Sequence, residues 1–279
     1  MNECAIFILS NGRPDKVKTY DYLKASFSGD VYILCDDQDE TLPDYKDKFG
    51  SKVIVFDKDE WVKKSDPMDN FNSKKSVLYA RNAVFEIADA MGYRYFAMAD
   101  DDIKDLQFRY EQGGKLLAKP VSNLDKVIDY IVELMSATVI SYFSFGTDKN
   151  FIGGVQNRNF QKKVIDKVYN FIICKSGQQH SYKGIMNEDE IHNVISLSTG
   201  VLLKSLTAIQ IVMEPVGKGE TGGNSETYKE NGYYSYTRNF YPIIACPFLE
   251  LKPNSKGFIF GADRNLYTPK ILEEELKQT

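Results

Sequence analysis

The chain has 279 residues, of which 43% are hydrophobic and 27% charged, and its net charge is −4. That length suits one large domain or two small ones with a substantial core, and the composition is ordinary for a globular protein. The negative charge excludes a large non-specific attraction to nucleic acid or anionic membranes, so a DNA substrate requires a local basic surface.

The cysteines and the apolar runs indicate the cellular compartment in which the protein works. The four cysteines form no CxxC pair, which argues against structural zinc and favours free thiols in a reducing cytoplasm. No stretch approaches ~18 uninterrupted apolar residues, and the N-terminus has no basic leader. We therefore expect a cytoplasmic protein with neither a membrane span nor a signal peptide.

The first hundred residues alternate between apolar strands and helical stretches. Strands are predicted at 4–9, 31–35, 53–56 and 94–99, with helices between them. This order predicts a parallel sheet with right-handed crossovers. In such sheets, ligands bind at the carboxyl ends of the strands.

Two of these strand ends carry candidate nucleotide contacts. The tight turn after the first strand contains Ser10 and Arg13, which we expect to face a nucleotide, as in a Rossmann-like unit. A solvated loop arginine is an equal alternative for Arg13. Asp36 ends the second strand, where an acidic residue often binds ribose or base. Its surroundings are so acidic that a plain solvated face is the alternative.

The stretch from residue 77 to 103 organises the chain. Helical spacing over 77–91 stops at a glycine, and a short apolar strand then ends in Asp100, Asp101 and Asp102. Three adjacent carboxylates repel one another unless a cation lies among them. Because side chains alternate along a strand, Asp100 and Asp102 are predicted to face one ligand, and Asp101 to point away into a supporting hydrogen bond. A divalent metal carrying a nucleotide diphosphate meets these requirements.

The second half of the chain has weaker patterns. Residues 107–121 contain a glycine pair and are predicted to leave the main fold as an excursion. Helical spacing returns over 123–140, and strands are predicted at 141–146 and 151–155.

Two further segments have a distinctive composition. Residues 157–175 carry five basic residues against one acid, which is typical of a solvated face, with a polyanion contact as the minor alternative. Residues 214–232 are rich in glycine and polar residues, and such a segment is either a lid over an active site or an ordinary disordered loop.

An acidic group recurs at Glu188, Asp189 and Glu190, with His192 close behind. Three acids are common at the start of a helix, where the helix dipole stabilises them, so on the residues alone decoration and catalysis are equally open. In a helix His192 lies on the same face as Asp189, which allows a third metal ligand or a hydrogen-bond partner. A surface histidine is the commoner alternative.

The order of these motifs carries a family resemblance. Ala80-Arg81-Asn82, a helix through Ala88, Gly92-Tyr93 and a strand ending in Asp-x-Asp resemble the nucleotide-sugar half of GT-A fold glycosyltransferases. The resemblance implies an α/β fold with a mostly parallel, Rossmann-like sheet flanked by helices. It implies a single domain over 1–279, with a nucleotide-sugar-binding half at 1–103 and an acceptor-binding half at 104–279.

The same resemblance implies roles for the site residues. Asp102 binds Mn²⁺ or Mg²⁺, and Asp100 binds the metal or the ribose of a UDP-sugar. Arg81 braces the nucleotide or the acidic strand end; the alternative is a plain ion pair with a nearby carboxylate. Glu188-Asp189 is similar to the Glu-Asp motif of inverting GT-A enzymes, in which Asp189 is the general base and Glu188 its orienting neighbour.

A narrower resemblance concerns the acceptor. The Gly12-Arg13-Pro14 turn, the Ala-Arg-Asn helix, the three aspartates and the later Glu-Asp pair resemble small phage glycosyltransferases of the TET-associated type, which decorate hydroxymethyl-pyrimidines in DNA. This implies hexosyl or pentosyl transfer to modified DNA in the host cytoplasm. A polysaccharide, lipid or protein acceptor is an alternative. So are a nucleotidyltransferase, whose glycine-rich basic loop is missing here, and a non-catalytic binding module.

Overall fold

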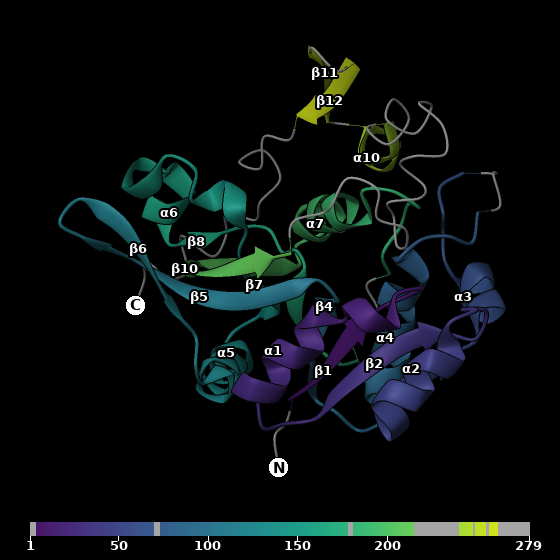
Figure 1. Cartoon of the computed structure of the whole chain (residues 1–279). Coiled ribbons are helices and arrows are strands. Elements are labelled where there is room, and N and C mark those ends of the chain that lie inside the picture. Colours follow the sequence, from purple (N-terminus) through teal and green to yellow (C-terminus); the bar gives the residue numbers. More distant parts are fainter. Residues whose placement is uncertain are drawn as a thin grey trace.

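Ten strands of the described residues join in one mixed sheet in the order β3-β2-β1-β4-β9-β7-β10-β5-β6, with β8 paired to β10 (Figure 1). The computed structural model describes residues 4–69, 73–177, 181–214, 240–247, 249–254 and 257–261. The strands of this sheet are β1 (Cys4–Leu9), β2 (Val31–Asp36), β3 (Val53–Phe56), β4 (Tyr95–Asp100), β5 (Ile103–Gln112), β6 (Lys115–Pro120), β7 (Ile140–Gly146), β8 (Val164–Ile165), β9 (Phe171–Lys175) and β10 (Leu202–Met213). The α-helices are α1 (Lys18–Ser26), α2 (Leu42–Phe49), α3 (Lys58–Lys64), α4 (Leu78–Ala90), α5 (Leu124–Ala137), α6 (Arg158–Lys162), α7 (Glu188–Ser198) and α10 (Phe240–Ala245). A separate hairpin consists of β11 (Glu250–Asn254) and β12 (Gly257–Gly261).

The strand directions confirm the predicted mostly parallel α/β sheet. β1 pairs in parallel with β2 and β4, β2 pairs in parallel with β3, and β10 pairs in parallel with β7. β9 runs antiparallel to both of its neighbours, β4 and β7, and β5 runs antiparallel to β10. Parallel strands joined by helices have both faces covered, which agrees with their nearly continuous apolar sequences.

Two apolar cores lie on opposite faces of the sheet. In β1, Ile6 and Ile8 belong to the core covered by α1, α2 and α5, whereas Phe7 and Leu9 belong to the core covered by α3, α4 and α7. This division follows from the two-residue period of a strand. Burying a side chain as completely as Phe7, which is 0% exposed, contributes roughly 1.5–3 kcal/mol.

Two predicted elements of the second half are wrong. Residues 107–121 do not leave the fold; they form the β5–β6 hairpin, in which Gly113 and Gly114 have φ of 60° and 75° and make the tight turn that glycine pairs favour. Residues 151–155 are not a strand but turns leading into the short 3₁₀ helix η4 (Gly154–Gln156), because Gly153 and Gly154 take positive φ there.

Other predictions concern larger units. The helix over 123–140 is confirmed as α5, with Asn123 capping its N-terminus through a hydrogen bond from the Lys126 backbone N–H. The division at 103/104 stays a prediction, and strands from both halves share the sheet. The predicted lid at 214–232 lies outside the described residues except for Glu214. None of the helices in the described ranges combines the length and the apolar character needed to cross a membrane.

Candidate active site

The carboxyl ends of three neighbouring parallel strands meet at one edge of the sheet. Leu9 of β1 is in register with Leu34 of β2 and with Asp100 of β4. The residues that follow these strands therefore lie side by side, although they are far apart in the sequence. This is the edge at which open α/β sheets bind ligands.

Asp100 is the last residue of β4, and both of its carboxylate oxygens are held. Arg81 donates from Nη2 to Oδ1 at 3.2 Å, and Asn170 donates from Nδ2 to Oδ2 at 2.7 Å. Thr19 of α1 donates to the Asp100 carbonyl oxygen at 2.6 Å. Each carboxylate oxygen still has a lone pair for a ligand, so these bonds orient the group without saturating it.

Asp101 is buried and ties the turn after β1 to the end of β4. Arg13 donates to both of its oxygens, from Nε to Oδ2 at 2.8 Å and from Nη2 to Oδ1, while Ser10 Oγ donates to Oδ2 at 2.6 Å. The Tyr45 hydroxyl accepts from the Arg13 backbone N–H at 3.1 Å and shares a hydrogen bond with Ser10. Burial raises the pKa of Asp101, and Arg13 and Ser10 oppose that rise.

These contacts exclude one of the two alternatives for Arg13. Only 22% of its side chain is exposed and its guanidinium is paired, so it is not a solvated loop arginine. Direct contact of Ser10, Arg13 and Asp101 with a nucleotide stays a prediction. What the structure shows is that they form one connected group beneath the turn.

Asp100 and Asp102 were predicted to face one ligand because side chains alternate along a strand. This reason is wrong, because the strand does not continue to Asp102. β4 ends at Asp100, and residues 101–102 form a turn into β5. Asp102 is half-buried, and burial together with the charges of Asp100 and Asp101 raises its pKa to about 7. Among the described residues, no other side chain donates a hydrogen bond to the Asp102 carboxylate. Asp100 and Asp101 each have an arginine, whereas Asp102 leaves uncompensated negative charge at the turn.

The donor set at this turn fits a divalent cation. Asp100 and Asp102 supply hard carboxylate oxygens, which suit Mg²⁺ or Mn²⁺. In the described part of the chain, no group of three or more His, Cys, Asp and Glu side chains is arranged to hold a metal. Two carboxylates completed by substrate phosphate and water are the usual surroundings of Mg²⁺ at phosphate sites. The metal roles of both residues stay predictions.

His192 lies in an aromatic environment. Its ring stacks on Tyr182 with centroids 4.1 Å apart and meets the edge of Tyr142 at 4.7 Å, and the residue is 3% exposed. It is therefore not a surface histidine. These contacts fit a packing role for the imidazole, and its role as a metal ligand stays a prediction.

Arg81 joins the two acidic motifs of the sequence. It lies in the first turn of α4, is 5% exposed, and donates from Nε to Glu188 Oε1 at 3.3 Å as well as to Asp100. Its guanidinium also lies 5.6 Å from the centroid of the Tyr182 ring. The two alternatives for Arg81 were bracing of the acidic strand end and a plain ion pair with a nearby carboxylate. They describe the same contact, because the carboxylate is Asp100 at the end of β4. Glu188 is the second partner of Arg81.

Glu188 and Asp189 begin α7, after Asn187 in the left-handed conformation with φ of 53°. Glu188 is buried, which raises its pKa, and Arg81 opposes that rise. Asp189 is half-buried; burial and the neighbouring charges of Glu188 and Glu190 raise its pKa. A carboxyl group with a raised pKa suits proton transfer near neutral pH. The three acidic residues at 188–190 therefore begin a helix. The first of them, Glu188, also accepts a hydrogen bond from Arg81.

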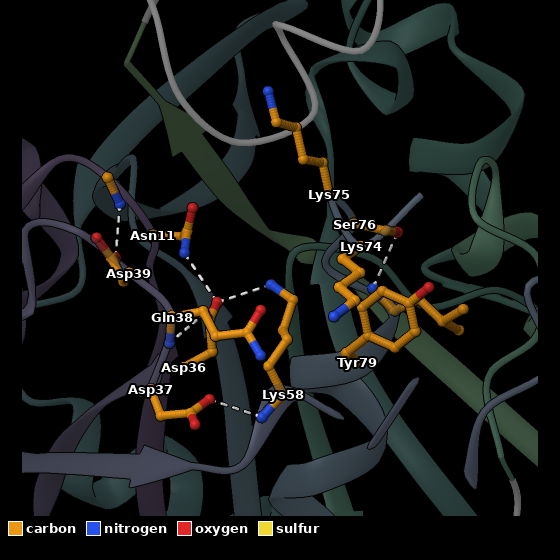
Figure 2. A network of polar contacts seen from close by, with 12 residues as sticks. Asn11, Asp36, Asp37, Gln38, Asp39, Lys58, Lys74, Lys75, Ser76 and Tyr79 are labelled. Atoms are coloured by element: carbon orange, nitrogen blue, oxygen red, sulfur yellow. Dashed lines mark hydrogen bonds and ion pairs between the residues drawn. The ribbon is translucent and has the colours of Figure 1, made fainter. Parts of the chain in front are cut away.

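A second polar network surrounds Asp36 (Figure 2). Asn11 Nδ2 and Lys58 Nζ donate to Asp36 Oδ2 at 2.9 and 2.8 Å. The side chains of Asp36 and Lys58 are only 5% and 10% exposed. Figure 2 shows Lys58 between Asp36 and Tyr79, and the Lys58 ammonium lies 5.8 Å from the centroid of that ring. Asp36 is therefore not part of a solvated acidic face; its contact with ribose or base stays a prediction.

Sequence reasoning missed two residues of this edge. Asn170, in the left-handed conformation with φ of 56° just before β9, holds Asp100, and Lys58 neutralises Asp36. The one local signal for Lys58 is its place directly after the third strand, at the start of a helix. Nothing local distinguishes Asn170, because its partner lies on a strand far away in the sequence.

One protein family and several solved structures are similar to this chain. Residues 4–223 match the TET-associated glycosyltransferase family. Among solved structures, the chain is similar to glucosyl-3-phosphoglycerate synthase from Mycobacterium tuberculosis in complex with Mg²⁺ and uridine diphosphate, with 7% identity, a TM-score of 0.47, and 93% of this chain and 86% of that chain covered. It is also similar to the same synthase with Mn²⁺, UDP-glucose and phosphoglyceric acid, with 8% identity, a TM-score of 0.42, and 76% and 72% covered. The search of curated proteins found no match.

The family match extends over most of the chain and includes every residue predicted for the site. It agrees with the enzyme class that the sequence predicts. The chain therefore belongs to the TET-associated glycosyltransferase family, and it is a glycosyltransferase.

Proposed function

We propose that this enzyme transfers a sugar from a UDP-sugar to a hydroxymethylated pyrimidine in DNA, with inversion at the anomeric carbon. The observation that carries the proposal is the position of Arg81 between Asp100 and Glu188. One buried guanidinium fixes the acidic end of β4 and the acidic start of α7 beside each other. A glycosyl transfer requires neutralisation of the diphosphate leaving group on the donor side and a base on the acceptor side.

The donor diphosphate is placed at the turn formed by residues 100–102. Asp100 and Asp102 hold the divalent metal there, and the metal supplies neutralisation of the diphosphate when it is bound. Asp101, locked by Arg13 and Ser10, keeps the turn rigid. Asp36, fixed by Lys58 and Asn11, faces the nucleoside.

Asp189 takes the proton in this proposal. The acceptor hydroxymethyl oxygen forms a bond to the anomeric carbon, the bond from that carbon to the diphosphate oxygen breaks, and its electron pair leaves with the diphosphate. The hydroxyl proton passes to the Asp189 carboxylate. Glu188 is held by Arg81 and fixes the first turn of α7, so it positions its neighbour without accepting the proton. The family name, TET-associated glycosyltransferase, supports a modified pyrimidine in DNA as the acceptor.

The proposal is tested by mass analysis of nucleosides after reaction. Duplexes with 5-hydroxymethylcytosine, 5-hydroxymethyluracil or unmodified cytosine are incubated with Mn²⁺ and a panel of nucleotide sugars, and then digested. We expect one hydroxymethylated nucleoside to gain the mass of a hexose or pentose, and the unmodified duplex to gain none. Asp102→Asn and Asp189→Asn are the inactive controls. If no hydroxymethylated duplex gains sugar from any donor while a glycan or lipid acceptor does, the DNA acceptor is wrong.

A further inference from the structure

A segment of the acceptor half presents a basic surface far from the acidic strand ends. From residue 149 to 165 the chain has four cationic residues and no Asp or Glu, although the whole protein has a net charge of −4. Lys149, Arg158, Lys162 and Lys163 are all exposed, and we call these four side chains the α6 surface. They lie in the middle of η3 (Asp148–Asn150), on α6 and directly after it.

The charges of the α6 surface are not compensated within the described protein. No described carboxylate forms an ion pair with any of its four side chains; the Lys163 ammonium lies 3.6 Å from the centroid of the Phe160 ring instead. Other lysines of the protein do pair: Lys48, Lys52, Lys58, Lys64 and Lys74 each form an ion pair with a carboxylate. A group of unpaired cations on an acidic protein is complementary to an anionic partner.

The backbone beneath the α6 surface is held in place. The Asn157 side chain accepts from the Asn159 and Phe160 backbone N–H groups and donates to the carbonyl oxygens of Lys149 and Ile152. Phe151 and Phe160 pack together at 6.1 Å, and both are buried. The charges are therefore carried on an ordered platform, so less conformational entropy is lost when a partner binds.

This platform is joined to the candidate active site through β10 (Figure 1). The Lys163 carbonyl accepts from the Thr207 N–H at 2.7 Å, and the Asp102 carbonyl accepts from the Glu214 N–H at 2.7 Å. Seven residues of nearly extended chain separate Thr207 from Glu214, which corresponds to about 20 Å. Figure 1 shows α6 and α7 on the same side of β7 and β10, with α5 on the other side. At ~3.4 Å per base pair, 20 Å corresponds to about six base pairs of duplex DNA.

We propose that the α6 surface binds the phosphate backbone of duplex DNA to one side of the acceptor base, at a distance from the candidate active site of about 20 Å. The inference rests on the proposed function, because it assigns the place at which the proposed acceptor is held. Lysine and arginine bind phosphates through charge without reading sequence, so the surface contributes affinity and orientation and leaves the choice of base to the active site.

The test is the salt dependence of DNA binding. Fluorescence anisotropy measures binding of a labelled duplex with one central 5-hydroxymethylcytosine over a series of KCl concentrations. The variants are Arg158→Gln/Lys162→Gln and, separately, Lys149→Gln. The control is Lys24→Gln/Lys126→Gln, which removes two exposed lysines from α1 and α5, on the opposite face of the sheet. Circular dichroism and thermal unfolding check that every variant folds.

Each lost phosphate contact lowers the slope of log K against log salt by about 0.9. We expect the double variant to lose about 1.8 of the wild-type slope, Lys149→Gln to lose about 0.9, and the control to lose none. UDP affinity, and transfer to the free 5-hydroxymethyldeoxycytidine nucleotide, are expected to be unchanged in all of them. A variant that loses sugar transfer to the duplex but keeps transfer to the free nucleotide is therefore impaired in DNA binding and not in the chemical step.

Two results overturn the inference, and they differ in what else they affect. If the wild type glycosylates the duplex and the α6 variants keep its slope, the DNA lies elsewhere and the proposed function stands. If the wild type neither binds nor glycosylates this duplex or the matching duplex with 5-hydroxymethyluracil, both the α6 assignment and the DNA acceptor are wrong.

Discussion

Arg81→Met removes the cation between Asp100 and Glu188 while keeping a long side chain in the same space. The Glu188 side chain is 6% exposed, so it stays buried without its charge partner, and removing one partner of a buried pair costs about 3–5 kcal/mol. The Asp100 side chain is 23% exposed and keeps its bond from Asn170, so most of the loss comes from Glu188. We expect the free energy of unfolding to fall by about 3 kcal/mol at neutral pH.

The pH dependence of this loss identifies Glu188 as its source. Burial already raises the folded-state pKa of Glu188, and removing Arg81 raises it further. The folded variant then binds more protons than its unfolded chain, so its stability increases as pH falls. In urea unfolding, we expect the deficit of Arg81→Met relative to wild type to be larger at about pH 8 than at about pH 5.

A second variant tests whether the charge, rather than the packing, is responsible. Arg81→Met/Glu188→Leu replaces both partners by apolar groups, which is often neutral, so it should recover much of the stability lost by the single variant. A loss below about 1 kcal/mol for Arg81→Met, or a double variant no more stable than the single one, would refute the reasoning.

The other predictions concern the two acidic motifs and the Asp36 network. In metal-free protein, the pKa of Asp102 is raised from 3.8 to about 7, so the folded state binds an extra proton and stability should fall as pH rises through this range. Asp102→Asn should make that decline shallower in thermal unfolding with chelator, because the other buried carboxyls keep their share of it; an unchanged decline contradicts the assignment. Asp189→Asn should slow sugar transfer ~10²–10⁴-fold and leave UDP affinity by calorimetry unchanged; transfer at the wild-type rate means that the base lies elsewhere. Lys58→Met should lower the free energy of unfolding in urea by about 3–5 kcal/mol, because it leaves Asp36 buried without its charge partner. The control Lys46→Met, at an exposed position of α2, should change it by less than ~0.5 kcal/mol. Equal losses for the two variants contradict a buried pair.

The local elements of the first hundred residues are predictable because each depends on short-range periodicity. Apolar runs of four to six residues gave β1 to β4, and the spacing over 77–91 gave α4 within one residue at each end. The acidic edge followed from the rule that parallel strands place their carboxyl ends together. The predictions are wrong where periodicity is weak. The glycine pair at 113–114 makes the turn of a hairpin instead of the predicted excursion. At 151–155 the chain forms turns instead of the predicted strand, because two glycines there have positive φ.

The sequence by itself determined the order of strands and helices in the first hundred residues and the residues that end each strand. It also determined the two acidic motifs. Only the tertiary structure decided what holds them. In the fold, β9 lies antiparallel between β4 and β7, and this places Asn170 beside Asp100. The packing of α7 places Glu188 beside Arg81. Patterns of period 2 and 3.6 report which face of an element is buried, but not which distant element covers it. That choice depends on the packing of the whole sheet, and for this reason the partners of Asp100 and Asp36 could not be predicted from local sequence.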